Sequence, residues 1–484
     1  MDVKELTLQS NQNIKSALEV IDSSGLGVAF ITDKNSILLG LVTDGDIRRS
    51  LLNGEALTSE ISKIMNGNYT SLLIGTENGI VLNTLTNKVR IIPLVDIEGR
   101  LVDYASINKI RRISLASPLL DGNELAYVTD CIKSSWISSQ GKYVREFEEI
   151  FKDYHGGMPA LAVSNGTVAL HLALVALGIT KGDEVLVPNL TFAASVNSIL
   201  YTGATPVLID IEADTWNIDL KKAEEKITVN TKAIMPVHLY GNPCSMDEIV
   251  AFAKNNNLLI IEDCAEALGS YYKGKPVGIF GDASTYSFFG NKTITTGEGG
   301  MVVFKDPKIA DKAAMLRDHG MQKTKRYWHA EVGYNYRLTN IQAAIGVAQF
   351  ERLEQFVVAK RHIAQIYNQT LSKHPFFLIP AESQDSINSY WLYTFLVNET
   401  APFTRDELIE YLNRQGVETR PVFFPMHQMP PYVNFGKSED LVISTRVSQC
   451  GMSLPSSLNL SEMELVYICG EINKFVTTYN ASES

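Results

Sequence analysis

One lysine stands in an unusual setting in the stretch YSFFGNKTITTGEGG, which runs from Tyr286 to Gly300. Lys292 follows an aromatic run that favours a strand, and a cluster of glycines follows the lysine. Glycines allow positive φ angles and close packing of a loop. A primary amine held in such a loop can attack a carbonyl carbon, although most lysines simply lie in solvent. The chemistry of Lys292 therefore depends on the groups that the fold brings to it.

Two other segments offer groups that suit a phosphorylated carbonyl cofactor. In VSNGTVAL a strand is expected to end at Asn165 and a helix to begin at Gly166 and Thr167, whose free N–H groups can bind a phosphate. In LLIIEDCAEALG, Asp263 ends an apolar strand, where a carboxylate is costly unless it meets a cation or strong donors. Each segment alone also fits an ordinary helix N-cap.

Together with Lys292, these segments match the needs of pyridoxal phosphate. The lysine would bind the cofactor covalently, Asp263 would hold the protonated ring nitrogen, and the helix amides would hold the phosphate. Asp263 would keep the ring able to accept electrons, and Lys292 would carry protons once it is displaced from the cofactor.

The elements that would position these groups alternate along residues 119–365. Apolar runs that favour strands cover residues 159–165, 183–188, 205–211, 232–241 and 258–265. Helical patterns cover residues 166–179, 192–203 and 246–257. This alternation predicts a parallel sheet covered on both faces, which is a doubly wound α/β domain with its sites at the carboxyl ends of the strands.

Two further regions flank this domain. Residues 1–112 show short strand signals at 27–32 and 89–96 with helical stretches between them, and residues 111–118 resemble a linker. Residues 366–484 show helical patterns at 404–416 and 461–476 around the Pro-rich segment RPVFFPMHQMPPY, which predicts a smaller α+β domain. The expected domains are therefore 1–112, 113–365 and 366–484.

Composition argues against several classes of protein. The 484 residues are 45% hydrophobic and carry a net charge of −11 without a basic block, so no nucleic-acid partner is expected. No apolar run approaches a membrane span, and the N-terminus does not resemble a signal peptide, so we expect a cytoplasmic protein without a membrane partner. The five cysteines are scattered without a CxxC pair, which indicates a reducing compartment and no metal site.

The motifs SNGTVALHLAL, GDEVLVPNLTF, VHLYG, EDCAEALG, SFFGNKTITTGEGG and GYNYRLTNIQAAIG, in this order, resemble the DegT/DnrJ/EryC1/StrS sugar aminotransferases. The resemblance runs from about Ser117 to the C-terminus and implies a fold-type I pyridoxal phosphate enzyme. It implies transfer of an amino group from L-glutamate to a nucleotide-linked keto sugar. The segments SSWISSQGKYVREFE and GVETRPVFFPMH most resemble members that act at C4 of GDP-4-keto-6-deoxy-mannose.

The resemblance also assigns roles to single residues. Lys292 matches the lysine that binds the cofactor, and Asp263 matches the partner of the ring nitrogen. Glu266 matches a position near the cofactor O3′, with a solvated helix residue as the alternative. Because some relatives carry histidine at the lysine position and are dehydratases, Lys292 favours transamination.

The remaining assignments concern the phosphate and the ring face. Gly166, Thr167 and Ser287 match the phosphate cradle. Phe192 matches the aromatic residue that stacks on the cofactor ring, with a plain core residue as the alternative. Asn335 matches an asparagine that reaches the phosphate of the neighbouring subunit, which implies a homodimer with shared active sites.

The segment ITDKNSILLGLVTDGDIRR resembles a CBS motif, so residues 1–112 are expected to form a CBS pair. The resemblance implies that Thr43 and Asp46 contact the ribose and phosphate of an adenine nucleotide. The later copy, VDIEGRLVDYASINKIRR, has Ser106 where the first has Thr43 but Lys109 where the first has Asp46. A pair that binds no ligand and serves structure or dimer formation is the alternative.

Two rival functions stay open at this stage. One is the same reaction on a UDP- or dTDP-linked 4-keto or 3-keto sugar. The other is a nucleotide-sensing regulator that has lost catalysis, against which the intact pair of Lys292 and Asp263 argues.

Overall fold

The computed structural model describes residues 3–76, 78–86, 88–106, 112–322, 324–382 and 385–480. The chain divides into two compact units. One is Met1–Ile113 with Glu410–Val417, and the other is Ser114–Ile409 with Glu418–Ser484. Among the helices in the described ranges, none combines the length and the apolar character of a membrane span.

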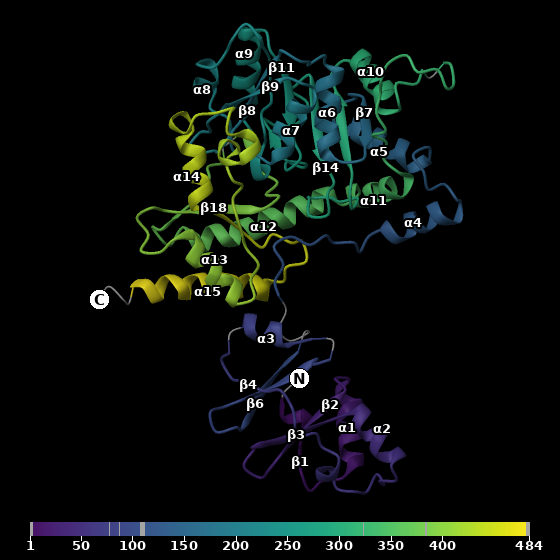
Figure 1. Ribbon diagram of the computed structural model, residues 1–484, viewed down its shortest axis with the longest axis vertical. Helices are drawn as coiled ribbons and strands as arrows, with labels where there is room; N and C mark the ends of the chain where they lie inside the picture. Colours follow the sequence, from purple (N-terminus) through teal and green to yellow (C-terminus); the bar gives the residue numbers. More distant parts are fainter. Residues whose placement is uncertain are drawn as a thin grey trace. The chain divides into compact units, whose positions relative to one another are not determined.

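A seven-stranded sheet forms the centre of the second unit (Figure 1). Its spatial order is β7 (Ala160–Val163), β15 (Gly300–Phe304), β14 (Ala283–Ser287), β11 (Leu259–Asp263), β10 (Thr231–Ile234), β8 (Glu184–Pro188) and β9 (Thr205–Ile209). Strand β15 runs antiparallel to both of its neighbours, and the other strands run parallel to one another. The predicted doubly wound, mostly parallel sheet is therefore confirmed.

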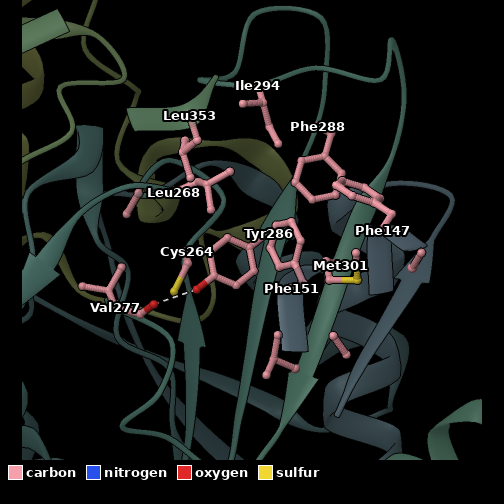
Figure 2. Close-up of a cluster of buried hydrophobic side chains, with 14 of the residues drawn as sticks. Phe147, Phe151, Cys264, Leu268, Val277, Tyr286, Phe288, Ile294, Met301 and Leu353 are labelled. Carbon is pink, nitrogen blue, oxygen red and sulfur yellow. Dashed lines mark hydrogen bonds between the residues drawn. The ribbon is translucent and has the colours of Figure 1, made fainter. Parts of the chain in front are cut away.

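Apolar side chains cover both faces of this sheet, because successive residues of a strand point to opposite faces. In β15, Met301 and Val303 belong to one buried cluster, whereas Val302 and Phe304 belong to the other. Figure 2 shows the first cluster, in which Tyr286 and Met301 of the sheet meet the phenylalanines of α5. The first face packs on α5 (Lys142–Tyr154), α9 (Met246–Asn256) and α11 (Asn340–Phe350), and the second on α6 (Gly166–Ala176), α7 (Ala193–Tyr201) and α10 (Pro307–Arg317).

One predicted strand is shorter than expected. The apolar pattern at 232–241 gives only β10, which ends at Ile234, and the 3₁₀ helix η3 (Leu239–Gly241) follows. Pro236 has no N–H to donate to a ladder, and Tyr240 adopts a positive φ of 53°. The regular ladder is therefore interrupted after Ile234, although Val237 still pairs with Asp263 of β11, and the chain then turns at Tyr240.

A second, antiparallel sheet lies in the C-terminal part of the same unit. Its order is β16 (Phe377–Leu378), β18 (Tyr393–Val397), β20 (Gly451–Leu454) and β19 (Arg420–Pro421). The helices of this part are α12 (Leu353–Leu371), α14 (Val442–Cys450), α15 (Glu462–Asn480) and the first half of α13 (Arg405–Arg414), whose residues from Glu410 onward group with the first unit. Helix α12 continues through residue 365, so the domain boundary expected there falls inside a helix rather than in a linker.

The first unit contains two three-stranded sheets of the same topology. In one, β1 (Thr7–Gln9) pairs parallel with β2 (Val28–Thr32), which pairs antiparallel with β3 (Leu38–Thr43). The other repeats these directions in β4 (Leu72–Leu73), β5 (Ile91–Val95) and β6 (Leu101–Ser106). The helices of this unit are α1 (Ile14–Ser24), α2 (Asp44–Leu52) and α3 (Asn78–Thr84). Strands β2 and β5 confirm the two strand signals read from the sequence.

Candidate active site

The parallel strands of the large sheet end at one common edge, and the candidate residues lie there. Gly166 follows β7, Phe192 follows β8, Asp263 ends β11 and Ser287 ends β14. In doubly wound sheets the carboxyl ends of the strands form the ligand site. The topology thus gathers residues that are more than 100 positions apart in the chain.

Asp263 is 4% exposed and depends on two local donors. Its Oδ2 accepts a hydrogen bond from Ser195 Oγ at 2.7 Å, and its Oδ1 accepts from the Ala265 N–H at 3.1 Å. Burial raises the pKa of Asp263, whereas these donors and the Lys292 charge act in the opposite direction. A buried carboxylate with only two donors still has capacity to accept from a protonated ring nitrogen.

Lys292 lies in the loop between β14 and β15, and its side chain is 13% exposed. Its Nζ is 3.4 Å from Glu266 Oε1 and 3.6 Å from the centroid of the Trp391 ring. Burial lowers the pKa of Lys292, while Glu266 and Asp263 act to raise it. A lysine with a depressed pKa is more often neutral and therefore more nucleophilic.

Glu266 is buried at 5% exposure, which excludes the solvated helix residue considered as an alternative. Its Oε2 accepts the Tyr240 N–H at 2.8 Å, and its other oxygen faces Lys292. Burial raises the pKa of Glu266, although Lys292 and the Tyr240 N–H oppose this effect. A carboxyl group with a raised pKa holds a proton more readily and can then donate a hydrogen bond.

The phosphate cradle depends on a close approach between the start of α6 and the end of β14. Asn165 caps α6 by accepting the Val168 N–H at 3.0 Å, so the first amides of the helix stay free. A Cβ built on Gly166 would lie 2.8 Å from the Ser287 Cβ, so only glycine lets the serine approach the helix start. Thr167 is the second residue of the same helix. Free amides and two hydroxyl groups suit a phosphate.

Two predicted residues make no described hydrogen bond to Lys292, Asp263 or Glu266. Phe192 is 60% exposed and contacts Phe423 at a centroid distance of 5.8 Å, so it is not the core residue considered as an alternative. Asn335 is exposed, and its Oδ1 accepts from Arg337 Nε at 3.2 Å. No described hydrogen bond joins Asn335 to Lys292 or Asp263 of its own chain.

Sequence reasoning missed three residues at this edge. Ser195 contacts Asp263, Tyr240 donates to Glu266, and Trp391 lies under the Lys292 amine. Ser195 had a readable signal, since it stands four residues after Thr191 in the segment that follows β8, and the two hydroxyl oxygens are 2.8 Å apart. Trp391 lies in the C-terminal sheet region, and no local pattern connects it with Lys292.

One group of buried side chains in the described ranges has metal-ligand character: His238, Glu262 and Cys264. The Glu262 carboxylate, however, accepts three backbone N–H groups, from Gly278, Phe280 and Gly281. These bonds fix the loop after β13 (Lys275–Pro276) and use the carboxylate for structure.

In the first unit, Thr43 and Asp46 bond to each other at the start of α2. Asp46 Oδ2 accepts from Thr43 Oγ1 at 2.6 Å, and Asp46 Oδ1 pairs with Arg49 at 2.6 Å. Together they form a capping box, so a nucleotide would have to share these groups with the helix cap. Ser106 is buried at the end of β6, and Lys109 lies outside the described residues.

The sheet and its carboxyl edge are those of a pyridoxal phosphate-dependent aminotransferase. The chain belongs to the DegT/DnrJ/EryC1/StrS aminotransferase family, whose model matches residues 118–473, and a CBS domain model matches residues 1–53. Enzymes of this family use pyridoxal phosphate, and the lysine, carboxylate and glycine cradle described above fit that cofactor. The CBS match ends before the second three-stranded sheet begins.

The chain is similar to characterised relatives over nearly their whole length. It is 49% identical over 366 residues to GDP-perosamine synthase of Escherichia coli O157:H7, which covers 76% of this chain and 99% of that protein. It is 49% identical over 360 residues to GDP-perosamine synthase of Caulobacter vibrioides, with 74% and 97% covered. Among solved structures, the PLP form of the putative sugar aminotransferase Spr1654 from Streptococcus pneumoniae superposes with a TM-score of 0.72 at 28% identity, covering 76% of this chain and 99% of that one.

Proposed function

We propose that this protein transfers an amino group from L-glutamate to C4 of GDP-4-keto-6-deoxy-D-mannose, which gives GDP-perosamine. The observation that carries the reaction class is the buried Lys292 amine, with the carboxylates of Asp263 and Glu266 at the same sheet edge. The choice of substrate rests on the 49% identity to GDP-perosamine synthases. Glutamate leaves as 2-oxoglutarate, and the sugar carbonyl becomes the amine, so the exchange balances without another reactant.

Two residues carry the proton chemistry in this proposal. When bound, pyridoxal phosphate supplies an electron sink for the carbon that gains or loses a proton. Lys292 holds the cofactor and, once free, moves that proton with its Nζ. Asp263 stays ionised and faces the ring nitrogen, and the hydrogen bonds from its two donors fix the orientation of its carboxylate.

The remaining residues position the cofactor. Gly166, Thr167 and Ser287 hold the phosphate, while the exposed ring of Phe192 lies on the cofactor face. Glu266, whose pKa burial raises, donates to or accepts from the O3′ atom.

We further propose a homodimer in which Asn335 reaches the phosphate of the partner's site. The exposed position of Asn335 supports this role, because its side chain does not contact the cluster of its own chain. Exposed apolar side chains on and beside α4 (Glu124–Lys133) also favour an interface, since Leu125 is 79% and Trp136 57% exposed.

For the first unit we propose a CBS pair. The repeated strand order of its two sheets supports two copies, although the family model covers only the first. An adenine nucleotide at Thr43 and Asp46 would have to compete with the capping box, which favours weak binding.

The substrate test uses the purified protein with ¹⁵N-labelled L-glutamate and separate GDP-, UDP- and dTDP-linked keto sugars. We expect the label in the GDP-linked amino sugar, detected by mass spectrometry. Labelling of only the UDP- or dTDP-linked sugars would replace the substrate but keep the reaction class. If none of the sugars carries the label, the proposed amino-transfer reaction is wrong.

Lys292→Ala is the matched control for this test. It should abolish transfer, and borohydride should reduce the wild-type holoenzyme to a stable adduct on the Lys292 peptide. An adduct on another lysine would contradict the assignment of Lys292.

A further inference from the structure

Trp391 is held on three sides behind the lysine loop. It is 5% exposed, and its indole N–H donates to the Asn291 carbonyl at 2.7 Å, directly before Lys292. Its own carbonyl accepts from the buried Lys360 Nζ at 3.0 Å. Tyr240 stacks on its ring at 5.9 Å with planes 9° apart. The ring therefore has one orientation.

The ring of Trp391 also contacts the Lys292 amine. The distance of 3.6 Å from Nζ to the ring centroid is well inside the roughly 6 Å limit of a cation–π contact. Among the residues that the structure describes, the carboxylate oxygen paired with this amine is Glu266 Oε1, at 3.4 Å, which is long for an ion pair between buried groups. Glu266 Oε1 is nearer than the ring centroid, but this contact is too long for a tight ion pair, so the rigid ring gives the amine a second fixed partner in the absence of a covalent bond.

We propose that Trp391 is a positioning residue that holds the protonated Lys292 amine whenever this amine is not joined to the cofactor. This inference rests on the proposed role of Lys292. A lysine that shuttles protons must leave the cofactor and return to it in every cycle. A ring that attracts the ammonium at a fixed point keeps Nζ close to the cofactor site. The lysine side chain therefore samples fewer conformations before it rejoins the cofactor.

Other charged groups that face Lys292 also shift its pKa. Asp263 at the end of β11 and Glu266 just after it favour the ammonium, and burial opposes it. Lys360 of α12 lines the same small cavity as Lys292 and can only disfavour a second positive charge. The negative face of the indole adds to the two carboxylates, so its removal should lower the pKa of the lysine.

The test titrates Lys292 in the apoenzyme, without turnover. A trace amine-reactive reagent labels only neutral amines, and mass spectrometry of the Lys292 peptide across pH gives the pKa of this lysine. Mono-, di- and trifluorotryptophan placed at position 391 alone keep the shape and the N–H donor while they weaken the negative ring face. Trp391→Phe and Trp391→Leu form a second pair, since both lose the N–H donor and only Phe keeps a ring.

We expect labelling of Lys292 at neutral pH to rise stepwise with each fluorine. In Trp391→Leu it should be about tenfold faster than in Trp391→Phe, which corresponds to a pKa lower by about one unit. Lys142, which lies over Tyr143, should not change in any variant. A fluorine series that leaves Lys292 labelling flat would overturn the proposal, even if Trp391→Leu fails to fold.

The two proposals fail in different ways. If the proposed function is wrong, the borohydride adduct forms on another lysine or no amine is transferred, whatever the fluorine series shows. If the present inference is wrong, the series is flat while the adduct stays on Lys292.

Discussion

At the scale of single residues, burial shifts the three ionisable groups of the site toward their neutral forms. It raises the pKa of Asp263 and Glu266 and lowers that of Lys292. The site must nevertheless keep Asp263 ionised to hold a protonated ring nitrogen. Ser195 supplies the side-chain hydrogen bond that favours the ionised form, which makes it a positioning residue for Asp263.

Ser195→Ala should therefore move the acidic limb of the pH profile upward. Loss of a hydrogen bond to a charged group costs about 1.5–3 kcal/mol, so the pKa of Asp263 should rise by about one unit or more and kcat/KM should fall at least about tenfold below neutral pH. The measurement is the pH dependence of kcat/KM. Ser198→Ala is the matched control, because Ser198 is equally buried in α7 but donates to the Ser195 carbonyl. An unshifted acidic limb in Ser195→Ala would remove Ser195 from this role.

At the scale of elements, the sequence predicted the strands that end at the site but not the contacts between their ends. β7, β8 and β11 follow the expected ranges closely, as do the helices α6 and α7 after the first two and α9 before the third, because apolar runs and helical periodicity are local signals. β10 is shorter than expected because Pro236 and the turn at Tyr240 end it. Trp391 could not be predicted, since its approach to residue 291, 100 positions away, is set by packing of the second sheet.

The start of α6 offers a test of the cradle. In Gly166→Ala the new Cβ would lie 2.8 Å from the Ser287 Cβ, so the serine or the helix must shift. Overpacking of this kind costs about 1–3 kcal/mol, so we expect the dissociation constant of pyridoxal phosphate to rise about tenfold or more. Gly470→Ala in α15 is the control, because no atom lies within 4 Å of its added Cβ.

The double variant Gly166→Ala/Ser287→Gly separates crowding from other causes. If the clash with Ser287 explains the loss, the double variant should bind the cofactor no worse than Ser287→Gly alone. Strictly additive losses, measured by cofactor titration, would show that Gly166 acts in another way.

Helix α12 carries a buried amine whose titration should be visible in stability. Lys360 is 4% exposed and donates to the carbonyls of Trp391 and Ser456, and burial lowers its pKa to about 7. Between about pH 7 and the unfolded pKa near 10.4, the unfolded chain binds this proton and the folded chain does not. The contribution of Lys360 to stability is therefore smallest below pH 7 and increases as the pH rises through that window.

Lys360→Met should remove this dependence. The free energy of unfolding of the wild type, relative to the variant, should rise by more than about 1 kcal/mol per pH unit between pH 7 and pH 9. Urea unfolding of both proteins at pH 6, 7, 8 and 9 measures this difference in the free energy of unfolding. The buried cysteines are the same in both proteins, so their contribution drops out of the difference. Parallel curves across this range would show that Lys360 stays charged in the folded protein.

At the scale of the whole molecule, the chain joins a complete aminotransferase to a separate N-terminal unit. The GDP-perosamine synthases of Escherichia coli O157:H7 and Caulobacter vibrioides are matched over 99% and 97% of their lengths by only 76% and 74% of this chain. All the candidate cofactor residues lie after residue 114, in the unit that these relatives share. We therefore expect that the first unit is not required for the chemistry.

A truncated protein that begins at Ser114 should fold, bind pyridoxal phosphate and transfer the amino group at close to the full-length rate. Its thermal midpoint should be lower, because Glu410–Val417 groups with the first unit and loses those neighbours. Cofactor absorbance, ¹⁵N transfer and thermal unfolding of both proteins measure the three parts of this prediction. A ligand of the first unit can change the rate only if it binds two states of the enzyme with different affinity, so any nucleotide effect on the full-length protein should vanish in the truncated one. A truncated protein that folds and binds the cofactor but transfers no amino group would make the first unit part of the catalytic machinery.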